Sequence, residues 1–158
     1  MKKTLCIILI MLLSVFCSCN VYVVKQNYLD AADVAKKYIE NLLILNDYTA
    51  AYHMMTEEFK TSLSQAQIKE LAVNCHKNNF PKELKIDGFE TYSGQELSTL
   101  ISIFLVTKNY SPQLYYRVAL EGTEKKGYLV AGLHISTEPI PAKGRRLPIE
   151  PVIAIGGA

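Results

Sequence analysis

Tyr38, Tyr52, Arg117 and His134 are the side chains of this sequence that best suit a binding site. A guanidinium holds an anionic group by charge and by several donors, while imidazoles and phenols can donate, accept or move a proton. The two tyrosines fall in segments with helical periodicity, and Arg117 and His134 fall in neighbouring predicted strands. We expect these four residues to be the ligand-binding candidates of the domain.

The role of Arg117 depends on which face of its strand points into the domain. Alternation places Tyr115 and Arg117 on one face, and Tyr116 and Val118 on the other. On a concave face, the guanidinium would lie inside the domain and select an anionic ligand. On a convex face it would be a solvated charge. We favour the convex face, because alternation normally sends charge outward.

Other catalytic or metal-binding patterns are missing from the sequence. The three histidines form no His-x-x-x-His pair, and no Cys-x-x-Cys occurs. Cys75 lies beside His76, but adjacent residues point in different directions on a helix, so we expect Cys75 to be a buried apolar residue. We therefore predict no catalytic residue, no metal site and no cofactor.

Three helices are predicted in the first half of the domain. Asp30 is the expected cap of the first, whose apolar stripe is Ala31, Val34, Ala35, Tyr38, Leu42 and Leu45. Asp47 caps a second helix over 48–55, and residues 56–59 form a further turn. Ser64 and Gln67 form a capping box that opens the third, which ends near Lys77.

Four strands are predicted after the helices, over 84–91, 97–107, 114–120 and 128–136. In the first, Leu84, Ile86, Gly88 and Glu90 alternate against Lys85, Asp87, Phe89 and Thr91. Residues 137–158 contain four prolines, which disfavour strand pairing, so this tail is predicted to be disordered. The alternative is that its apolar segment 152–155 adds to a sheet edge in this or another protein.

Helices followed by antiparallel strands predict an α+β fold, with three helices packed on one face of a curved sheet of about four strands. The segments Leu45–Tyr52, Thr56–Lys60 and Leu63–Ile68, with this order of elements over residues 30–136, resemble small bacterial lipoproteins and exported proteins with a nuclear-transport-factor-2-like domain. The resemblance implies a cone-shaped roll whose first helix lies across the concave face of the sheet. The cone is then either a ligand pocket or a filled core.

That fold hosts enzymes, binding modules and scaffolds, so it assigns no function. The resemblance also implies that the convex face of the sheet can bind a protein partner or a second copy of this chain. Tyr115 and Tyr128 are candidates for such a face, because tyrosine suits interfaces.

The first residues predict export. Lys2 and Lys3 precede an apolar run that ends in Ser18–Cys19, which resembles the end of a bacterial lipoprotein signal. We expect residues 1–19 to be the signal, Cys19 to carry lipid, and 20–29 to be a linker. Two alternatives stay open: an uncleaved membrane anchor, since the uncharged run is long enough to cross a bilayer, and an ordinary cleaved signal. In each case the domain lies on the far side of the membrane from the cytoplasm, and with lipid on Cys19 it is held in the cell envelope.

The charge balance argues against nucleic acid as a partner. The chain has 17 basic and 15 acidic residues, so removal of Lys2 and Lys3 with the signal leaves 15 of each. A chain without net charge lacks the field that attracts nucleic acid. With Cys75 as its single cysteine, the domain cannot form an internal disulfide.

Three functions follow from these observations. The first is a membrane-anchored, non-catalytic domain that binds a small molecule or a protein. The second is an inner-membrane assembly component, because a membrane helix followed by this fold resembles scaffold subunits of secretion and conjugation machines. The third is a small isomerase or dehydratase that works in the cone.

Overall fold

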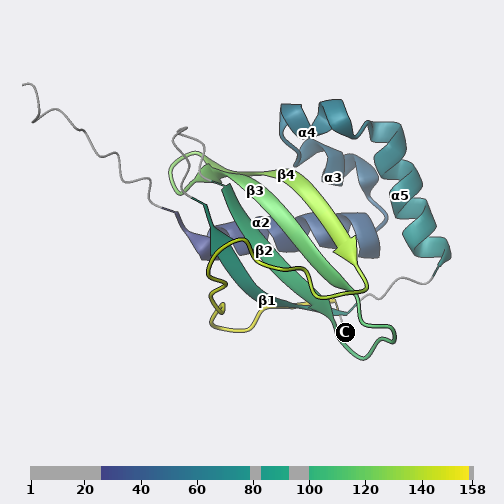
Figure 1. Cartoon of the computed structure of the whole chain (residues 1–158). Coiled ribbons are helices and arrows are strands. Elements are labelled where there is room, and N and C mark those ends of the chain that lie inside the picture. The colour runs from purple at the N-terminus through teal and green to yellow at the C-terminus, as the bar shows by residue number, and fades with distance from the viewer. Residues whose placement is uncertain (1–25, 79–82, 93–99, 157–158) are drawn as a thin grey trace, which may run out of the picture.

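The computed structural model describes residues 26–78, 83–92 and 100–156, and these form an α+β fold (Figure 1). Helix α2 (Tyr28–Ile39) continues into a π-helical turn, η1 (Glu40–Ile44), and three further helices follow. These are α3 (Tyr48–His53), α4 (Glu57–Ser62) and α5 (Gln65–Lys77). The α+β class is therefore confirmed, whereas the expected count of three helices is wrong for the described residues. The signal segment lies outside them.

The first helix starts earlier and ends differently from the prediction. Asn27 is the N-cap, because its side-chain oxygen accepts from the amides of Leu29 and Asp30. A π-helical turn contains one residue more than an α-helical turn. This changes which side chains face the core, and the neighbours Leu42 and Leu43 are both buried. Leu45 lies beyond this turn and is exposed, although the regular helical stripe had placed it in the core.

The caps of the other helices are mostly those expected. Asp47 accepts from the amide of Ala50, and Ser64 and Gln67 form the predicted capping box. The predicted turn at 56–59 is instead the start of α4, where Thr56 accepts from the amide of Phe59. Short polar caps at fixed spacing satisfy the free amides of a first helical turn, which is why the sequence predicts them well.

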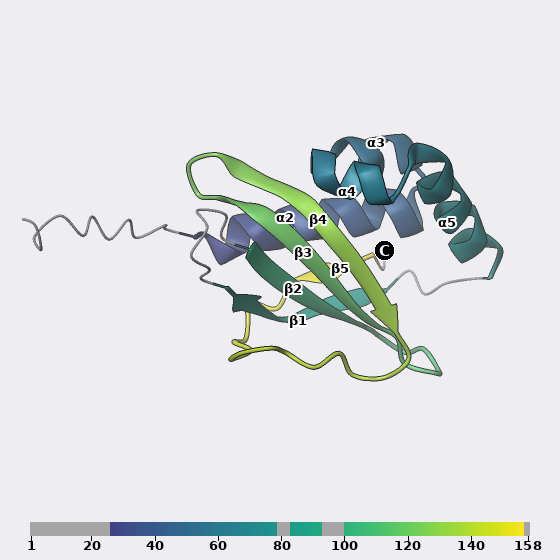
Figure 2. The ribbon, with the colours of Figure 1, turned by 45° about the horizontal axis from the view of Figure 1, so that its top comes forward.

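The sheet is antiparallel and has the strand order β4-β3-β2-β1-β5. The strands are β1 (Leu84–Thr91), β2 (Leu100–Thr107), β3 (Tyr115–Thr123), β4 (Gly127–Ser136) and β5 (Ala154–Ile155). Helix α2 contacts β2, β3 and β4, so the helices cover one face of the sheet (Figure 2). We call this the inner face and the opposite one the outer face.

The core lies between α2 and the inner face. From β3 it receives Tyr116, Val118 and Leu120, whereas Tyr115 and Arg117 belong to the outer face and are only half-buried. The outward orientation of Arg117 that alternation favoured is therefore correct.

A β-bulge between Ile86 and Gly88 changes the predicted faces of β1. Before the bulge Ile86 pairs with Leu105, and after it Phe89 pairs with Ile103, so Phe89 joins the inner face. Glu90 pairs with Ser102 on the outer face. The simple alternation predicted the reverse, because an extra residue in one strand shifts the parity of all that follow it.

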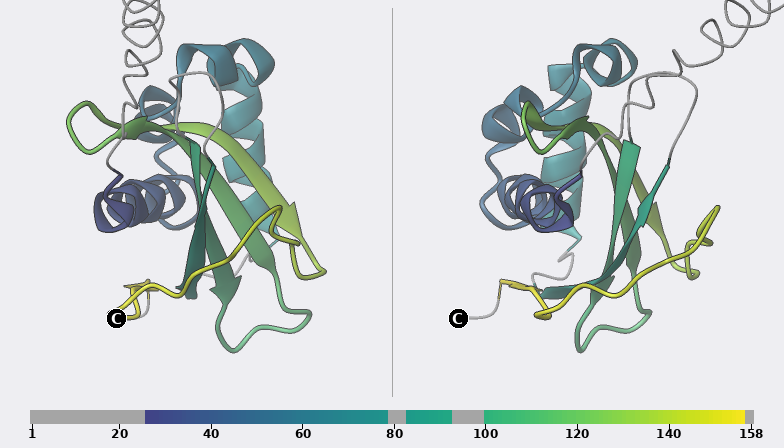
Figure 3. Two further views of the ribbon diagram at one scale, coloured as in Figure 1. Left: turned by 60° about the vertical axis from the view of Figure 1, so that its left-hand side comes forward. Right: turned by 90° about the vertical axis from the view of Figure 1, so that its left-hand side faces the viewer.

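The tail is folded through residue 156, so the prediction of a disordered tail is wrong for that segment. Figure 3 shows it leaving β4, crossing the outer face and passing around the edge at β1. Leu147 exchanges two backbone hydrogen bonds with Phe89, and β5 pairs with Leu84 and Lys85. Pro148 and Pro151 lie between these two pairing points, Pro139 and Pro141 precede them, and Ile140, Ile149 and Ile155 are buried. The alternative of a sheet-edge strand within this protein is the correct one.

Two residues of the tail test this packing. Ile155 is 1 % exposed and Val152 is 69 % exposed. We expect Ile155→Ala to lower the free energy of unfolding by about 2 kcal/mol, because it removes buried methyl groups. Val152→Ala, the control in the same segment, should change it by less than about 0.5 kcal/mol. Urea unfolding measures both, and equal small effects would contradict the packed tail.

Candidate binding site beneath the C-terminal strap

Residues 137–147 form a strap over the outer face of the sheet, and a groove of about 330 Å³ lies beneath it. Arg117 and His134 line the groove from the sheet, together with Ser136 at the end of β4. The strap contributes residues 138–143, among which Glu138 and Lys143 are charged. This groove brings together two of the four side chains that the sequence predicted as ligand-binding candidates.

Strand register places Arg117 and His134 side by side. Arg117 of β3 is the direct cross-strand partner of His134 in β4 and of Phe104 in β2. Side chains that face each other in this way have Cβ atoms ~5 Å apart and lie on the same face. The guanidinium and the imidazole can therefore contact the same small ligand.

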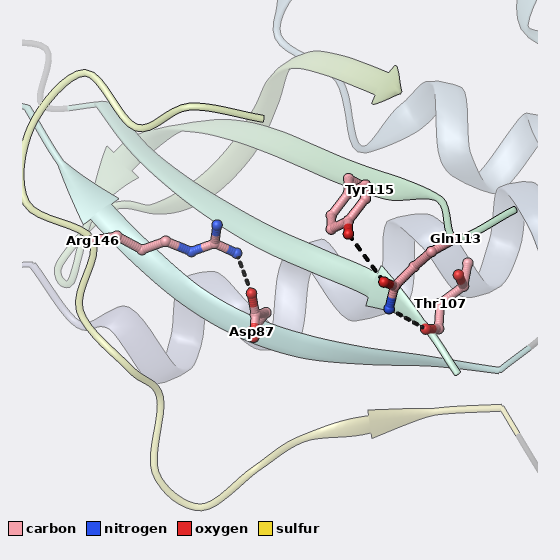
Figure 4. A network of polar contacts seen from close by, with 5 residues as sticks. All are labelled: Asp87, Thr107, Gln113, Tyr115 and Arg146. Atoms are coloured by element: carbon pink, nitrogen blue, oxygen red, sulfur yellow. Dashed lines mark hydrogen bonds and ion pairs between the residues drawn. The ribbon is translucent and has the colours of Figure 1, made fainter. Parts of the chain in front are cut away.

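The strap is fixed at Arg146, on the far side of the groove. The Arg146 guanidinium lies 4.1 Å from the centre of the Phe104 ring, and its Nη2 donates to Oδ2 of Asp87 over 2.6 Å (Figure 4). Gly88 makes room for the chain here, because a Cβ at that position would lie 2.6 Å from the carbonyl oxygen of Leu147. The same face carries Tyr115, whose hydroxyl donates to Gln113.

A buried carboxylate, Glu90, joins the strap to the sheet. Glu90 is a buried residue that accepts from the Tyr92 hydroxyl and from the backbone amide of Gly144 in the strap. Burial raises the pKa of Tyr92, as does its hydrogen bond to Glu90, while the nearby charge of Arg117 acts in the opposite direction. The phenol therefore stays protonated and remains a donor at neutral pH.

Sequence reasoning did not single out Glu90 or Tyr92. The alternation of β1 placed Glu90 with Leu84 and Ile86, which gave it no polar neighbour. The signal in the sequence was Gly88, since a glycine inside a strand marks a bulge or a close approach of another segment. Gly88 meets both descriptions in this structure.

Charge makes the groove suitable for an anion. Among the described residues, no carboxylate lies within 4.0 Å of the Arg117 guanidinium in an ion pair, and Glu40, Glu57 and Asp87 pair with other basic residues. Arg117 and Lys143 therefore bring two positive charges against the single carboxylate of Glu138. A guanidinium without a counter-ion, partly shielded from water, favours a carboxylate or phosphate group as its partner.

A second groove, of about 420 Å³, lies between α4 and the sheet and has the opposite charge. Its lining includes Glu58 and Glu121, with hydroxyls from Thr56, Thr61 and Ser62. Two carboxylates repel an anion, so the strap groove is the better anion site of the two.

Tyr38 and Tyr52 do not join the groove. Tyr38 is fully buried on the inner side of the sheet, and Tyr52 is half-buried on α3, where the Lys60 ammonium lies 5.6 Å from its ring centre. The predicted set of four is therefore split, since the sheet separates the two tyrosines from Arg117 and His134.

Large apolar side chains fill the space under α2. Tyr38, Ile39, Leu42, Ile103 and Tyr116 are each less than 2 % exposed. Among the described residues, the hydroxyls of Tyr38 and Tyr116 have no hydrogen-bond partner, and burial raises the pKa of both. These phenols resist ionisation, which makes the inner face a poor place for acid–base chemistry.

No family model, no curated protein and no solved structure matches this chain. In the described ranges, no group of three or more His, Cys, Asp or Glu residues could hold a metal ion. None of the helices in those ranges is long and apolar enough to cross a membrane. The predicted anchor at Cys19 lies outside the described residues.

Tyr38→Phe tests the buried phenol. Because its hydroxyl has no partner, its removal should leave the free energy of unfolding within about 1 kcal/mol of the parent chain at neutral pH. Above pH ~10 the unfolded chain releases the Tyr38 proton while the folded chain keeps it, so stability falls as pH rises. Tyr38→Phe should make this fall shallower by about 1.4 kcal/mol per pH unit.

Urea unfolding between about pH 9 and about pH 11 measures the difference. Ile39→Val, next to Tyr38 in the same core and without an ionisable group, is the control and should leave the alkaline slope unchanged. An alkaline slope that Tyr38→Phe does not alter would contradict the burial of this phenol.

Proposed function

We propose that this chain is an exported, membrane-anchored domain that binds an anionic ligand, without catalysis, in the groove between the strap and the outer face. The observation that carries the proposal is the position of Arg117 beside His134 in that groove. Arg117 binds the anionic group, His134 and Ser136 add hydrogen bonds, and Lys143 approaches from the strap. The ligand is a small molecule, or a terminus or acidic side chain of a partner protein, that presents a carboxylate or a phosphate.

The half-buried position of Arg117 supports specific binding. A charge pair in full contact with water contributes little, because water and salt screen it. Arg117 stands on a strand between Phe104 and His134, with the strap above it, so part of its surroundings is protein. A guanidinium that is partly enclosed by protein is less screened by water, so an anion that binds it there is held more strongly.

Glu90, the buried carboxylate that joins the strap to the sheet, serves the fold. Glu90 accepts from Tyr92 and Gly144, and it is buried. A general base must reach its substrate, and Glu90 is only 1 % exposed, with each of its two oxygens already accepting one hydrogen bond. This assignment of Glu90 to the strap supports a binding role over an enzymatic one.

The order of elements supports the proposed family resemblance. Helices precede an antiparallel sheet, and the first long helix lies on its inner face, as in a nuclear-transport-factor-2-like roll. In our proposal the filled space under α2 serves as the core of the roll, and binding has moved to the outer face. A protein partner or second copy at the outer face would meet the strap as well as the strands.

The anchor in this proposal is lipid on Cys19. When the full chain is expressed in a bacterium with labelled fatty acid, we expect the label on the parent chain and flotation of that chain with membranes. Cys19→Ala should lose both, while Cys17→Ala, the neighbouring control, should keep both. A mature chain that retains Lys2 would instead favour the uncleaved helix of an assembly component, and flotation without label would contradict lipidation.

Arg117→Gln tests the groove directly. NMR titration of the parent chain with succinate, and separately with inorganic phosphate, should shift the amides of Arg117, His134 and Lys143. Loss of a charge-assisted hydrogen bond should weaken binding about tenfold or more. Arg145→Gln removes the same charge from an exposed strap residue that does not line the groove, and should change affinity little. Equal weakening by both variants would indicate nonspecific attraction and contradict the site.

A further inference from the structure

Exposed apolar side chains gather at one end of the domain. Six large apolar residues are exposed among those the structure describes, and four of them are Tyr28, Leu29, Leu100 and Leu129, with exposed fractions of 37–47 %. Tyr28 and Leu29 open α2, Leu100 opens β2, and Leu129 lies near the start of β4. Glu121 of β3 pairs with Leu100 of β2 on one side and with Leu129 of β4 on the other. The three residues therefore form one cross-strand row.

A hydrogen bond ties the helix start to the strands at this end. The backbone amide of Asn27 donates to the hydroxyl oxygen of Tyr128 over 2.8 Å. Tyr28 also stacks on Phe89, with ring centres 4.7 Å apart. Figure 2 shows the β3–β4 hairpin projecting at the same end of the molecule as the start of α2. The chain therefore enters the domain beside this hairpin.

The hairpin has a fixed shape and carries two lysines. At Gly122, whose φ is +156°, a Cβ would lie 2.0 Å from the carbonyl oxygen of Gly127. Thr123 accepts from the amide of Lys126 at the turn. Lys125 and Lys126 are exposed at the tip, a few residues before the exposed Leu129.

We propose that this end of the domain docks on the surface of the lipid bilayer that holds the anchor. We call it the docking face, and it consists of Tyr28, Leu29, Leu100, Lys125, Lys126 and Leu129. The inference rests on the proposed anchoring at Cys19. It adds that the domain lies on the membrane in one orientation, with the β3–β4 hairpin toward the lipid.

The length of the linker supports a lipid surface as the occupant. Seven residues, and therefore eight Cα–Cα steps, separate Cys19 from the helix cap Asn27. Fully extended, they reach ~28 Å, and a relaxed linker is shorter. A lipid on Cys19 therefore keeps the start of α2 close to the bilayer, and the apolar side chains around that start are the first to meet it.

The residue types on the docking face also suit a bilayer surface. Tyrosine prefers the boundary between headgroups and acyl chains, and lysine can bury its methylene chain there while its ammonium stays in water. The two lysines are accompanied by three carboxylates: Glu121 between the two leucines, and Glu124 and Asp30, whose charges both act on Tyr128. Docking is therefore driven by the apolar side chains and should occur on uncharged lipid.

Photo-crosslinking of the full chain tests the orientation. A benzophenone amino acid replaces Leu129 in one variant and Leu45 in another, and each is reconstituted into phosphatidylcholine nanodiscs and irradiated. Leu45 is the matched control, since it is an exposed leucine beyond the opposite end of α2 and η1. We expect the label at position 129 to crosslink to lipid at least several times more than the label at position 45.

Flotation before irradiation separates the two proposals. A chain that floats with lipid but crosslinks equally from both positions overturns the docking face and leaves the anchor standing. Crosslinking from position 129 mainly to a second copy of the chain also overturns it, because the occupant is then protein. A chain that does not float overturns the anchor, and the docking face with it.

Discussion

The buried carboxylate of Glu90 connects the two parts of the structure on which the site depends. It belongs to β1, and its two oxygens accept one hydrogen bond each, from the hydroxyl of Tyr92 just after β1 and from the amide of Gly144 in the strap. A buried carboxylate without donors is costly, so the strap and the sheet stabilise each other through this group. Without the strap, Arg117 and His134 would lie on an uncovered face of the sheet. The groove would not exist, because residues 138–143 of the strap form one of its sides.

The sequence predicts most of the elements because their signals are local. Asp47 and the pair Ser64 and Gln67 cap helices by hydrogen bonds within one turn. Alternation in β3 correctly places Arg117 outside and Tyr116 inside. Both kinds of signal depend on neighbours a few residues away, so distant parts of the chain do not change them.

The errors arise where distant segments or an irregular turn decide the outcome. The bulge after Ile86 moves Glu90 to the outer face, where its donor Gly144 lies 54 residues further along the chain. The π-helical turn removes Leu45 from the core. The prolines predicted an unpaired tail, yet Leu147 pairs with β1 between Pro141 and Pro148, and β5 pairs with β1 after Pro151. Composition alone carries no information about such pairing.

Two of the four predicted binding residues, Arg117 and His134, belong to the candidate site. The imidazole of His134 and the guanidinium of Arg117 were chosen as residue types, and the register of β3 and β4 brings them together. The expected meeting place was the cone under the first helix, which large side chains such as Tyr38 and Tyr116 fill. The strap creates the groove on the outer face. The path of the strap depends on contacts with β1 that are distant in sequence, so no local pattern predicts it.

The most direct test of this account is native-state hydrogen exchange of the amides of Phe89, Gly144 and Leu147. If the strap is closed over the outer face, these amides are hydrogen-bonded and should exchange orders of magnitude more slowly than in an unfolded chain. Gly144 should lose its protection in Glu90→Ala while an amide of α5 keeps its own. Exchange of Gly144 and Leu147 at the unfolded-chain rate in the parent protein would contradict the strap and the groove beneath it.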